Sequence, residues 1–291
     1  MSCGCGRSPD FCRGWHSLSE EEWKKELAEW KADNEFEKPV EGRHMVEVTE
    51  VHHYTDKLFR FCTEKPKGYL FQAGEFVMIG LGDKIKRAYS VTSSPTQNHL
   101  EFYSIKVPDG KLTSRLKNIQ PGDKIEVGSK STGTLLPKYL KPGRNLWLMA
   151  TGTGIAPFTS IIRDPETYEK FNEVILFQTC RQINELEFGK RTVESIFKDD
   201  LLSEIVSDKL KFFPTTTREP SQYFGRVTDW LKSKKFEEVI GSDLNPSEDR
   251  AMICGSIAML NEFKGICLQK GLVEGSNSSP GHFVIEKAFV D

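Results

Sequence analysis

Residues 145–158 read NLWLMATGTGIAPF, and this stretch decides the fold class of the second half of the chain. NLWLMA (145–150) is a short, almost wholly apolar run, which is typical of a strand buried on both faces. TGTGIAPFTSIIRD (151–164) follows it with a glycine turn and the start of a helix. A buried strand that leads through glycines into a helix predicts one unit of a parallel sheet.

The same rhythm continues to the end of the chain. EVILFQTC (173–180), KLKFFPTTT (209–217) and RAMICGS (250–256) read as further strands, with a polar helix ending near 194–196 between the first two. IAMLNEFKGICLQKG (257–271) reads as a helix, and HFVIEKAFVD (282–291) as a final strand. Alternation of this kind predicts an α/β domain with a parallel sheet, placed at residues 143–291.

Upstream, apolar and polar residues alternate in short runs separated by turn signals such as KPKG, SSPTQN and QPGD. One short helix is expected within KLTSRLKN (111–118). About six strands in this length favour a small antiparallel barrel or sandwich, assigned to residues 43–142. The runs are MVEVTEVHHY (45–54), KLFRFCTE (57–64), LFQAGEFVMIGLG (70–82), RAYSVTS (87–93), LEFYSIKV (100–107) and KIEVGS (124–129).

Composition excludes several classes of protein. With 291 residues, 37% hydrophobic and 28% charged, the chain matches an ordinary globular protein of about two domains. The formal net charge of -2 argues against a nucleic-acid binder. No apolar run approaches the roughly 18 residues of a membrane span, and the first residues lack the apolar core of a secretory signal. The expected location is therefore cytoplasmic.

KRAYSVTSSP (86–95) combines a strand with a ligand-binding pattern. Arg87 and Tyr89 are two residues apart, so in a strand they share a face. A guanidinium suits a phosphate, and a phenol ring suits a flat aromatic ligand. The alternative is an edge strand with a solvated arginine and a packed tyrosine.

Candidate ligand-binding residues also follow the strands of the predicted parallel sheet, where ligands of such sheets bind. Gly152 and Gly154 let a phosphate approach backbone amides, although a simple tight turn has the same glycines. Arg181, Arg218 and Arg226 could surround a dianionic group, or each could be a surface arginine. Cys254 would lie at the same edge, with a buried structural thiol as the alternative.

Six motifs occur in order along the chain: RAYS (87–90), IKVPDGKLTSRL (105–116), ATGTGIAPF (150–158), TREP (217–220), ICGS (253–256) and VIEKAFVD (284–291). From about Arg43 to Asp291 the chain therefore resembles the bacterial ferredoxin/flavodoxin–NADP reductases. The resemblance implies an FAD-binding antiparallel barrel followed by an NADP-binding α/β domain. It also implies an enzyme that passes electrons between NADPH and ferredoxin or flavodoxin.

The resemblance assigns residues to FAD. Arg87 would hold the pyrophosphate, Tyr89 would lie against the isoalloxazine, and the Ser90 hydroxyl would lie near the reactive nitrogen of the ring. Residues 105–107 would line the flavin edge, residues 112 and 113 would bind pyrophosphate oxygens, and Thr132 would approach the adenosine. The full set is Arg87, Ala88, Tyr89, Ser90, Ile105, Lys106, Val107, Lys111, Leu112, Thr113, Thr132, Ala288 and Phe289.

The resemblance likewise assigns residues to NADP and to the hydride-transfer site. The three arginines match the family's 2′-phosphate residues, so NADPH should be preferred over NADH. The NADP set is Thr151, Gly152, Thr153, Gly154, Arg181, Arg218, Arg226, Cys254, Gly255, Ser256 and Met259. The catalytic set is Ser90, Cys254, Glu286 and Ala288.

The last residues depart from the plant-type pattern. Ala288 stands where those relatives place a tyrosine on the flavin, and Phe289, Val290 and Asp291 follow. The resemblance implies that Phe289 can stack on the FAD adenine. It also implies that this extension adjusts before nicotinamide reaches the flavin.

Residues 1–42 lie outside the resemblance. Cys3, Cys5, Cys12 and His16 form a set of three thiolates and one imidazole that suits a tetrahedral metal site. The pattern resembles the [2Fe–2S] ligands of CDGSH proteins, but the spacing and the residues before the histidine differ. Zinc, an iron–sulfur cluster and no metal all remain open. SLSEEEWKKELAEWKADNEF (17–36) follows and predicts a helix that opens with a capping box.

The four remaining cysteines are scattered, which in a reducing compartment does not indicate a disulfide framework. Two other functions remain open beside the reductase. One is an oxygenase-type reductase with an N-terminal metal relay, and the other is a flavin-binding redox sensor that recruits partner proteins. Nothing in the pattern favours an obligate dimer, so a monomer is expected.

Overall fold

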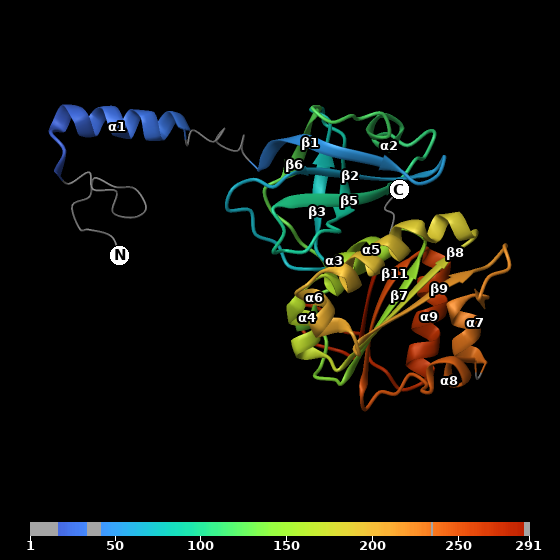
Figure 1. Ribbon diagram of the computed structural model, residues 1–291. Helices are drawn as coiled ribbons and strands as arrows, with labels where there is room; N and C mark the ends of the chain where they lie inside the picture. Colours follow the sequence, from blue (N-terminus) through green and yellow to red (C-terminus); the bar gives the residue numbers. More distant parts are fainter. Residues whose placement is uncertain (1–16, 34–41, 234, 288–291) are drawn as a thin grey trace. The chain divides into compact units, whose positions relative to one another are not determined.

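The computed structural model describes residues 17–33, 42–233 and 235–287 (Figure 1). The chain divides into two compact units, residues 1–41 and 42–291. In the first unit, helix α1 spans Glu20–Asp33. The Ser19 amide donates to the Glu22 carboxylate at 3.0 Å, and the Glu22 amide donates to the Ser19 hydroxyl at 3.3 Å. These reciprocal bonds are the predicted capping box, which satisfies amides that the helix itself cannot pair.

Six antiparallel strands form the first part of the second unit, in the order β4-β3-β6-β1-β2-β5. The edges β4 and β5 are brought together by a bridge between Val91 and Phe102, so the sheet nearly closes into a barrel. The six predicted strands and the short helix α2 (Thr113–Leu116) are confirmed. The strands are β1 (Arg43–His53), β2 (Leu58–Glu64), β3 (Phe76–Gly80), β4 (Lys86–Ser90), β5 (His99–Ile105) and β6 (Lys124–Gly128).

A second six-stranded sheet follows, in the order β10-β9-β8-β7-β11-β12, and every pair in it is parallel. All five predicted strands are present, and the two-residue edge strand β10 was not predicted. The strands are β7 (Asn145–Thr151), β8 (Glu173–Cys180), β9 (Leu210–Thr216), β10 (Tyr223–Phe224), β11 (Asp249–Gly255) and β12 (Phe283–Lys287).

Helices cover both faces of the parallel sheet (Figure 1). Successive residues of β7 face opposite ways, so Leu146 and Leu148 join one apolar cluster while Trp147 and Met149 join the other. The first face carries α3 (Ala156–Ile162), α4 (Pro165–Lys170), α5 (Glu187–Lys198) and α6 (Leu202–Val206), and the second carries α7 (Val227–Lys232), α8 (Lys235–Ile240) and α9 (Ile257–Gln269). Single 3₁₀ turns lie at η2 (Pro137–Tyr139), η3 (Gly152–Ile155) and η4 (Ile183–Leu186).

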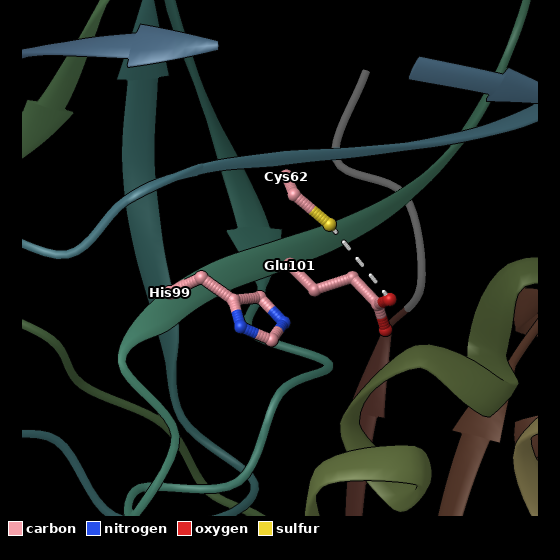
Figure 2. A group of neighbouring side chains, drawn as sticks. All are labelled: Cys62, His99 and Glu101. Carbon is pink, nitrogen blue, oxygen red and sulfur yellow. Dashed lines mark hydrogen bonds between the residues drawn. The ribbon is translucent and has the colours of Figure 1, made fainter. Parts of the chain in front are cut away.

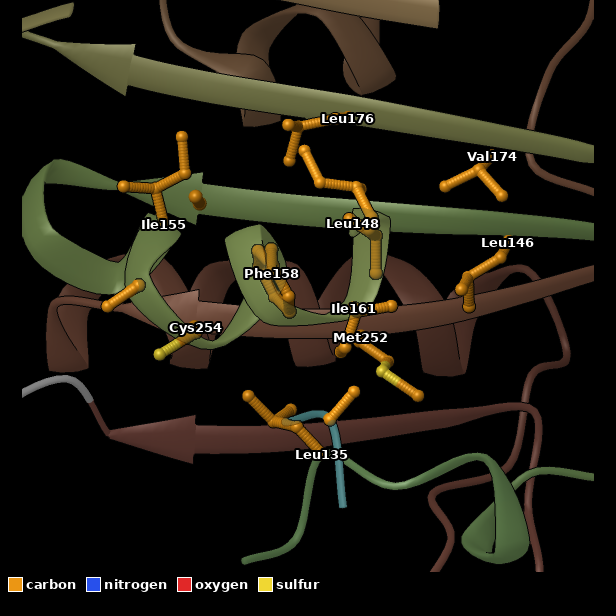
Figure 3. Packing of buried hydrophobic residues seen from close by; sticks show 14 of the residues in the cluster. Leu135, Leu146, Leu148, Ile155, Phe158, Ile161, Val174, Leu176, Met252 and Cys254 are labelled. Atoms are coloured by element: carbon orange, nitrogen blue, oxygen red, sulfur yellow. The ribbon is translucent and has the colours of Figure 1, made fainter. Parts of the chain in front are cut away.

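The first apolar cluster also contains residues from the barrel region. Figure 3 shows Leu135 beside Phe158 and Ile161 of α3 and the sheet residue Met252. Tyr103 of β5 stacks on Phe188 of α5, with ring centroids 4.1 Å apart. The barrel and the α/β layers therefore share this cluster, and the barrel strands also enclose an apolar cluster of their own. None of the described helices has the length and apolar composition that a bilayer crossing needs.

Candidate functional site

Strand β4 carries the predicted flavin residues. Arg87 is half-buried and donates to the Lys86 carbonyl at 2.9 Å, and it forms no salt bridge with any described residue. Tyr89 is buried, and its phenol oxygen accepts from the Ser104 hydroxyl at 3.3 Å. Burial raises the pKa of Tyr89. Arg87 and Tyr89 are two residues apart on β4, so they lie on the same face of the strand, as predicted.

The other predicted flavin residues lie on segments next to β4. Phe76 pairs with Ser90 on one side and bridges Thr132 on the other, so these two residues flank one strand position. Ser104, which contacts Tyr89, directly precedes Ile105. After β5, the chain turns back on itself, and the Thr113 hydroxyl donates to the Val107 carbonyl at 3.3 Å. Ala88, Val107, Lys111 and Thr132 are exposed, Ile105, Lys106 and Thr113 are half-buried, and Leu112 is buried.

The glycine turn after β7 packs closely against the end of β11. A Cβ atom at Gly154 would lie 2.3 Å from the Cys254 carbonyl oxygen, and one at Gly255 would lie 2.1 Å from the Thr151 hydroxyl. The Ser256 amide donates to that same hydroxyl at 3.1 Å. Side chains are thus excluded where two strand ends meet, which leaves backbone groups at the edge of the sheet.

The remaining members of this group surround the same strand ends. Gly152 has a φ of +55°, a conformation that favours glycine. Ser256 begins α9, and its hydroxyl accepts from the Met259 amide at 3.4 Å. Thr153 and Met259 are buried. A nucleotide at this edge would therefore meet mainly backbone and hydroxyl groups.

The three predicted arginines follow β8, β9 and β10, which are neighbours in the sheet. The Arg218 amide donates to the Arg181 carbonyl at 3.0 Å, so these two residues lie on adjacent turns. Arg226 directly precedes α7. All three are exposed, and none forms a salt bridge with a described residue. An open groove of about 630 Å³ adjoins Arg218. This arrangement leaves three guanidinium groups available to an anion.

Cys254 and Glu286 are register partners on β11 and β12. Cys254 is 1% exposed, and burial followed by the charge of Glu286 raises its pKa well above the ordinary value. Burial also raises the pKa of Glu286, against the opposing effect of Thr134. Both the amide and the hydroxyl of Thr134 donate to Glu286 Oε2 at 3.1 Å. The thiol is therefore neutral at physiological pH.

Sequence reasoning did not identify Thr134. It lies two residues after Thr132, and Thr132 bridges Phe76, the strand partner of Ser90. Residues 132–134 thus connect β3, the strand that pairs with β4 at Ser90, to the carboxylate of Glu286. The only sequence signal for Thr134 is the Thr-Gly-Thr run at 132–134, which occurs again at 151–153. The predicted residues Cys3, Cys5, Cys12, His16, Ala288 and Phe289 lie outside the described residues.

A separate cluster on the barrel, shown in Figure 2, brings together Cys62, His99 and Glu101. Their candidate ligand atoms lie within 4.8 Å of one another. Arg60 Nη1 lies 3.1 Å from the Cys62 sulfur, and Arg163 Nη1 lies 2.7 Å from a Glu101 oxygen. Burial, and then the charge of Glu101, raises the pKa of the Cys62 thiol to about 12. Two guanidinium groups and a protonated thiol do not fit a cation site.

The two nucleotide regions, by contrast, fit groups that carry phosphates. Arg87 and the three strand-end arginines form no salt bridge with a described residue, and each can donate two parallel hydrogen bonds to phosphate oxygens. The close approach at Gly154 and Gly255 leaves no room for side chains at the neighbouring strand ends. FAD on β4 and a nicotinamide nucleotide at the edge of the parallel sheet are compatible with these residues.

The chain matches two family models. Residues 43–134 match the oxidoreductase FAD-binding domain, and residues 148–264 match the oxidoreductase NAD-binding domain. The first match covers the barrel strands, and the second covers β7 to β11. Residues 1–42 lie outside both matches.

Known proteins resemble the chain over most of their own length. It is 52% identical over 248 residues to the flavodoxin/ferredoxin–NADP reductase of Rhodobacter capsulatus, covering 84% of this chain and 92% of that protein. It is 45% identical over 249 residues to the ferredoxin–NADP reductase of Pseudomonas aeruginosa, covering 84% and 96%. A crystal structure of a ferredoxin NADP+ reductase from Neisseria gonorrhoeae with bound FAD and NADP superposes with a TM-score of 0.77 at 31% identity, covering 85% of this chain and 99% of that one. The chain belongs to the bacterial ferredoxin/flavodoxin–NADP reductase family.

Proposed function

We propose that this protein is an FAD-dependent oxidoreductase that passes electrons between NADPH and ferredoxin or flavodoxin. One observation carries the proposal: the segment 132–134 connects Phe76 of β3, the strand partner of Ser90, to Glu286, the register partner of Cys254. A flavin on β4 and a nicotinamide at the end of β11 would meet there. Bound FAD supplies exchange of two electrons as hydride with NADPH and of single electrons with a one-electron carrier.

The flavin-binding residues act by position and charge. Arg87 would bind the pyrophosphate with its guanidinium, which forms no salt bridge with a described residue. The ring of Tyr89 is held by Ser104 and by an edge contact with Phe61, with ring centroids 6.4 Å apart. Ser90 would contact the ring. The remaining FAD residues are Ala88, Ile105, Lys106, Val107, Lys111, Leu112, Thr113 and Thr132.

Cys254 and Glu286 would form the wall against which the nicotinamide lies. A neutral thiol adds no charge beside the ring and excludes water, because Cys254 is buried. Burial raises the pKa of Glu286, against the opposing effect of the two hydrogen bonds that it accepts from Thr134, so its carboxyl group holds a proton to higher pH than an exposed glutamate does.

The nucleotide preferred by the enzyme would be NADPH. Arg181, Arg218 and Arg226 are exposed and form no salt bridge with a described residue, which suits the dianionic 2′-phosphate that distinguishes NADPH from NADH. The residues that would contact the rest of the nucleotide are Thr151, Gly152, Thr153, Gly154, Gly255, Ser256 and Met259.

A steady-state assay tests this proposal. Purified protein loaded with FAD is mixed with NADPH or NADH, and electron delivery is measured to ferredoxin, to flavodoxin and to an artificial dye. Rapid NADPH-dependent reduction of ferredoxin or flavodoxin is the expected result. Reduction of the dye alone would favour an oxygenase-type reductase with another client, and absence of flavin reduction would favour a redox sensor.

For residues 1–42, we propose that Cys3, Cys5, Cys12 and His16 hold one metal ion or cluster. Three soft thiolates and an imidazole suit zinc or a [2Fe–2S] cluster. Elemental analysis of purified protein should find about one Zn or two Fe per chain above the content of a Cys3→Ala, Cys5→Ala variant. Iron would add absorbance beyond the flavin bands, and finding neither metal would remove the proposal.

The last residues are proposed to contact the flavin, with Ala288 beside the ring and Phe289 on the adenine. Deletion of residues 289–291 should change NADPH affinity and the rate of flavin reduction in anaerobic stopped-flow measurements. Unchanged values of both would show that the tail does not limit access.

A further inference from the structure

The loop that follows β4 is tied to helix α3 of the other layer. The Ser160 hydroxyl donates to the Ser93 carbonyl at 2.6 Å. The Thr159 hydroxyl donates to the Ala156 carbonyl of its own helix at 2.7 Å and lies 3.4 Å from the Thr92 carbonyl oxygen. Arg163, which directly follows α3, donates to the same Thr92 carbonyl at 2.8 Å. Three successive polar contacts therefore fix residues 92 and 93 against one helix.

A buried ion pair lies at the centre of these contacts. Arg163 Nη1 is 2.7 Å from Glu101 Oε1, and the Arg163 and Glu101 side chains are 13% and 8% exposed. The Thr92 hydroxyl donates to the same carboxylate at 2.8 Å, and Arg60 lies 3.3 Å from its other oxygen. Burial alone would raise the pKa of Glu101, but Arg163, Thr92 and Arg60 outweigh it and hold the pKa below its ordinary value. The carboxylate is thus charged at neutral pH.

The pair lies between the two ligand-binding segments. Residue 92 comes two residues after Ser90, the end of β4. Helix α3 begins directly after the glycine turn 152–155 and is seven residues, or about 10 Å, long. Its first residues therefore adjoin the nucleotide turn, and Arg163, the residue directly after it, contacts Glu101. A short, fully buried helix transmits the position of one end to the other.

We propose that Glu101 and Arg163 are positioning residues that set the separation between the flavin on β4 and the nicotinamide at the turn after β7. The inference rests on the proposed function, because it assigns those two ligands to those segments. Hydride transfer depends steeply on the approach of the reacting atoms, and a displacement of about 1 Å can cost about a hundredfold in rate. Apolar packing around Phe158 and Ile161 buries α3 (Figure 3), but apolar contacts have no preferred direction. The ion pair between Glu101 and Arg163 is directional, so it can fix how the end of α3 lies against the loop after β4.

The experiment compares Glu101→Gln, Arg163→Met, Arg163→Lys and the double variant Glu101→Gln, Arg163→Met with the unaltered holoenzyme. Flavin content, the Kd for NADP+ and the rate of flavin reduction by NADPH per bound flavin are measured. Amide hydrogen exchange of residues 91–94 and 156–163 is measured without turnover. Ser160→Ala is a milder variant in case the charge changes prevent folding.

A matched control is Asp249→Asn. Asp249 is also a buried, hydrogen-bonded carboxylate, accepting from Asn145 at 2.9 Å and from the Asn245 amide at 2.7 Å. It begins β11, at the opposite end from Cys254. The Asp249→Asn variant should be less stable than the unaltered protein, as the Glu101→Gln variant is. Its rate of flavin reduction per bound flavin should be unchanged.

The expected result is a loss of at least tenfold in flavin reduction per bound flavin in the Glu101→Gln and Arg163→Met variants, with NADP+ affinity within about twofold. The double variant should be no slower than the slower single variant, Arg163→Lys should recover part of the rate, and exchange of residues 91–94 should accelerate. Rates per flavin within twofold of the unaltered enzyme, in these variants or in Ser160→Ala if only it folds, would overturn the proposal. Failure of the unaltered protein to oxidise NADPH would instead overturn the proposed function.

Discussion

The backbone amide of Arg218 donates to the carbonyl of Arg181 at 3.0 Å, which holds two arginines from neighbouring strands on adjacent turns. The bond involves only main-chain atoms, so replacing either side chain should leave the turns in place. The two guanidinium groups can therefore be tested separately from the backbone that carries them.

Arg218→Ala and Arg181→Ala should each raise the KM for NADPH about ten- to hundredfold while leaving the KM for NADH within about twofold. A hydrogen bond to a charged group is worth about 1.5–3 kcal/mol, and only NADPH carries the 2′-phosphate. Steady-state kinetics with both nucleotides checks this. Equal losses for NADPH and NADH would place the arginines elsewhere on the nucleotide.

Gly154→Ala should lower thermal stability and slow flavin reduction, because its Cβ would lie 2.3 Å from the Cys254 carbonyl oxygen and one of the two strand ends must shift. The matched control is Gly265→Ala in α9, where no atom lies within 4 Å of the added Cβ. That change should raise Tm by a few degrees, because alanine favours a helix by about 1 kcal/mol over glycine. Calorimetry and stopped-flow kinetics distinguish the two. A Gly154→Ala variant with unchanged Tm and rate would contradict the close approach described above.

Glu286→Gln should gain stability over the unaltered protein as pH rises. Burial raises the folded-state pKa of Glu286 above its ordinary value of 4.5. Below that pH the carboxyl group is protonated in both the folded and the unfolded protein, so it does not lower the free energy of unfolding. Above that pH the unfolded chain ionises first, so the unaltered protein loses stability until the raised pKa is passed, and glutamine avoids this loss.

Denaturant unfolding of both proteins at pH 4 and pH 8 measures the difference. Glutamine keeps an oxygen that accepts from Thr134, so the two bonds at this position can persist. A stability difference that is the same at both pH values, or that shrinks at pH 8, would be inconsistent with a raised pKa at Glu286.

Cys62 and Cys267 should resist alkylation in the folded protein. Burial raises the pKa of each thiol to about 12, so only about one molecule in ten thousand carries a thiolate there at pH 8. Peptide mass spectrometry after brief iodoacetamide treatment should find both unlabelled, and unfolding in guanidinium should expose both. Fast labelling of native Cys62 would show that the ion pairs around Glu101 open readily.

The sequence predicts the order and type of the main elements, because they depend on local patterns. Period-two alternation identified all six barrel strands, and the repeated strand-to-helix change identified the parallel sheet. The edge strand β10 was missed because two residues, Tyr223 and Phe224, are too short to show any period. The near closure of the barrel depends on a bridge between Val91 and Phe102 that no local pattern encodes.

The candidate site likewise contains some residues that local sequence patterns identify and others that they do not. Arg87, Arg181, Arg218 and Cys254 stand at strand positions that a local reading can find. Thr134 contacts a residue 152 positions away, and Glu101 contacts one 62 positions away. Such pairings are decided by how the two sheets pack, so the sequence marked neither residue.

The stacking of Tyr103 on Phe188 has a consequence for how such a protein can be cut or recombined. Leu58, Tyr103 and Leu135 belong to the same apolar cluster as the helices α3 and α5, so neither half buries this cluster by itself. A gene fragment that encodes only one half would expose that cluster and aggregate. Heating should therefore give a single calorimetric peak. A functional chimaera would need to exchange both halves together, or the residues of this shared cluster on both sides.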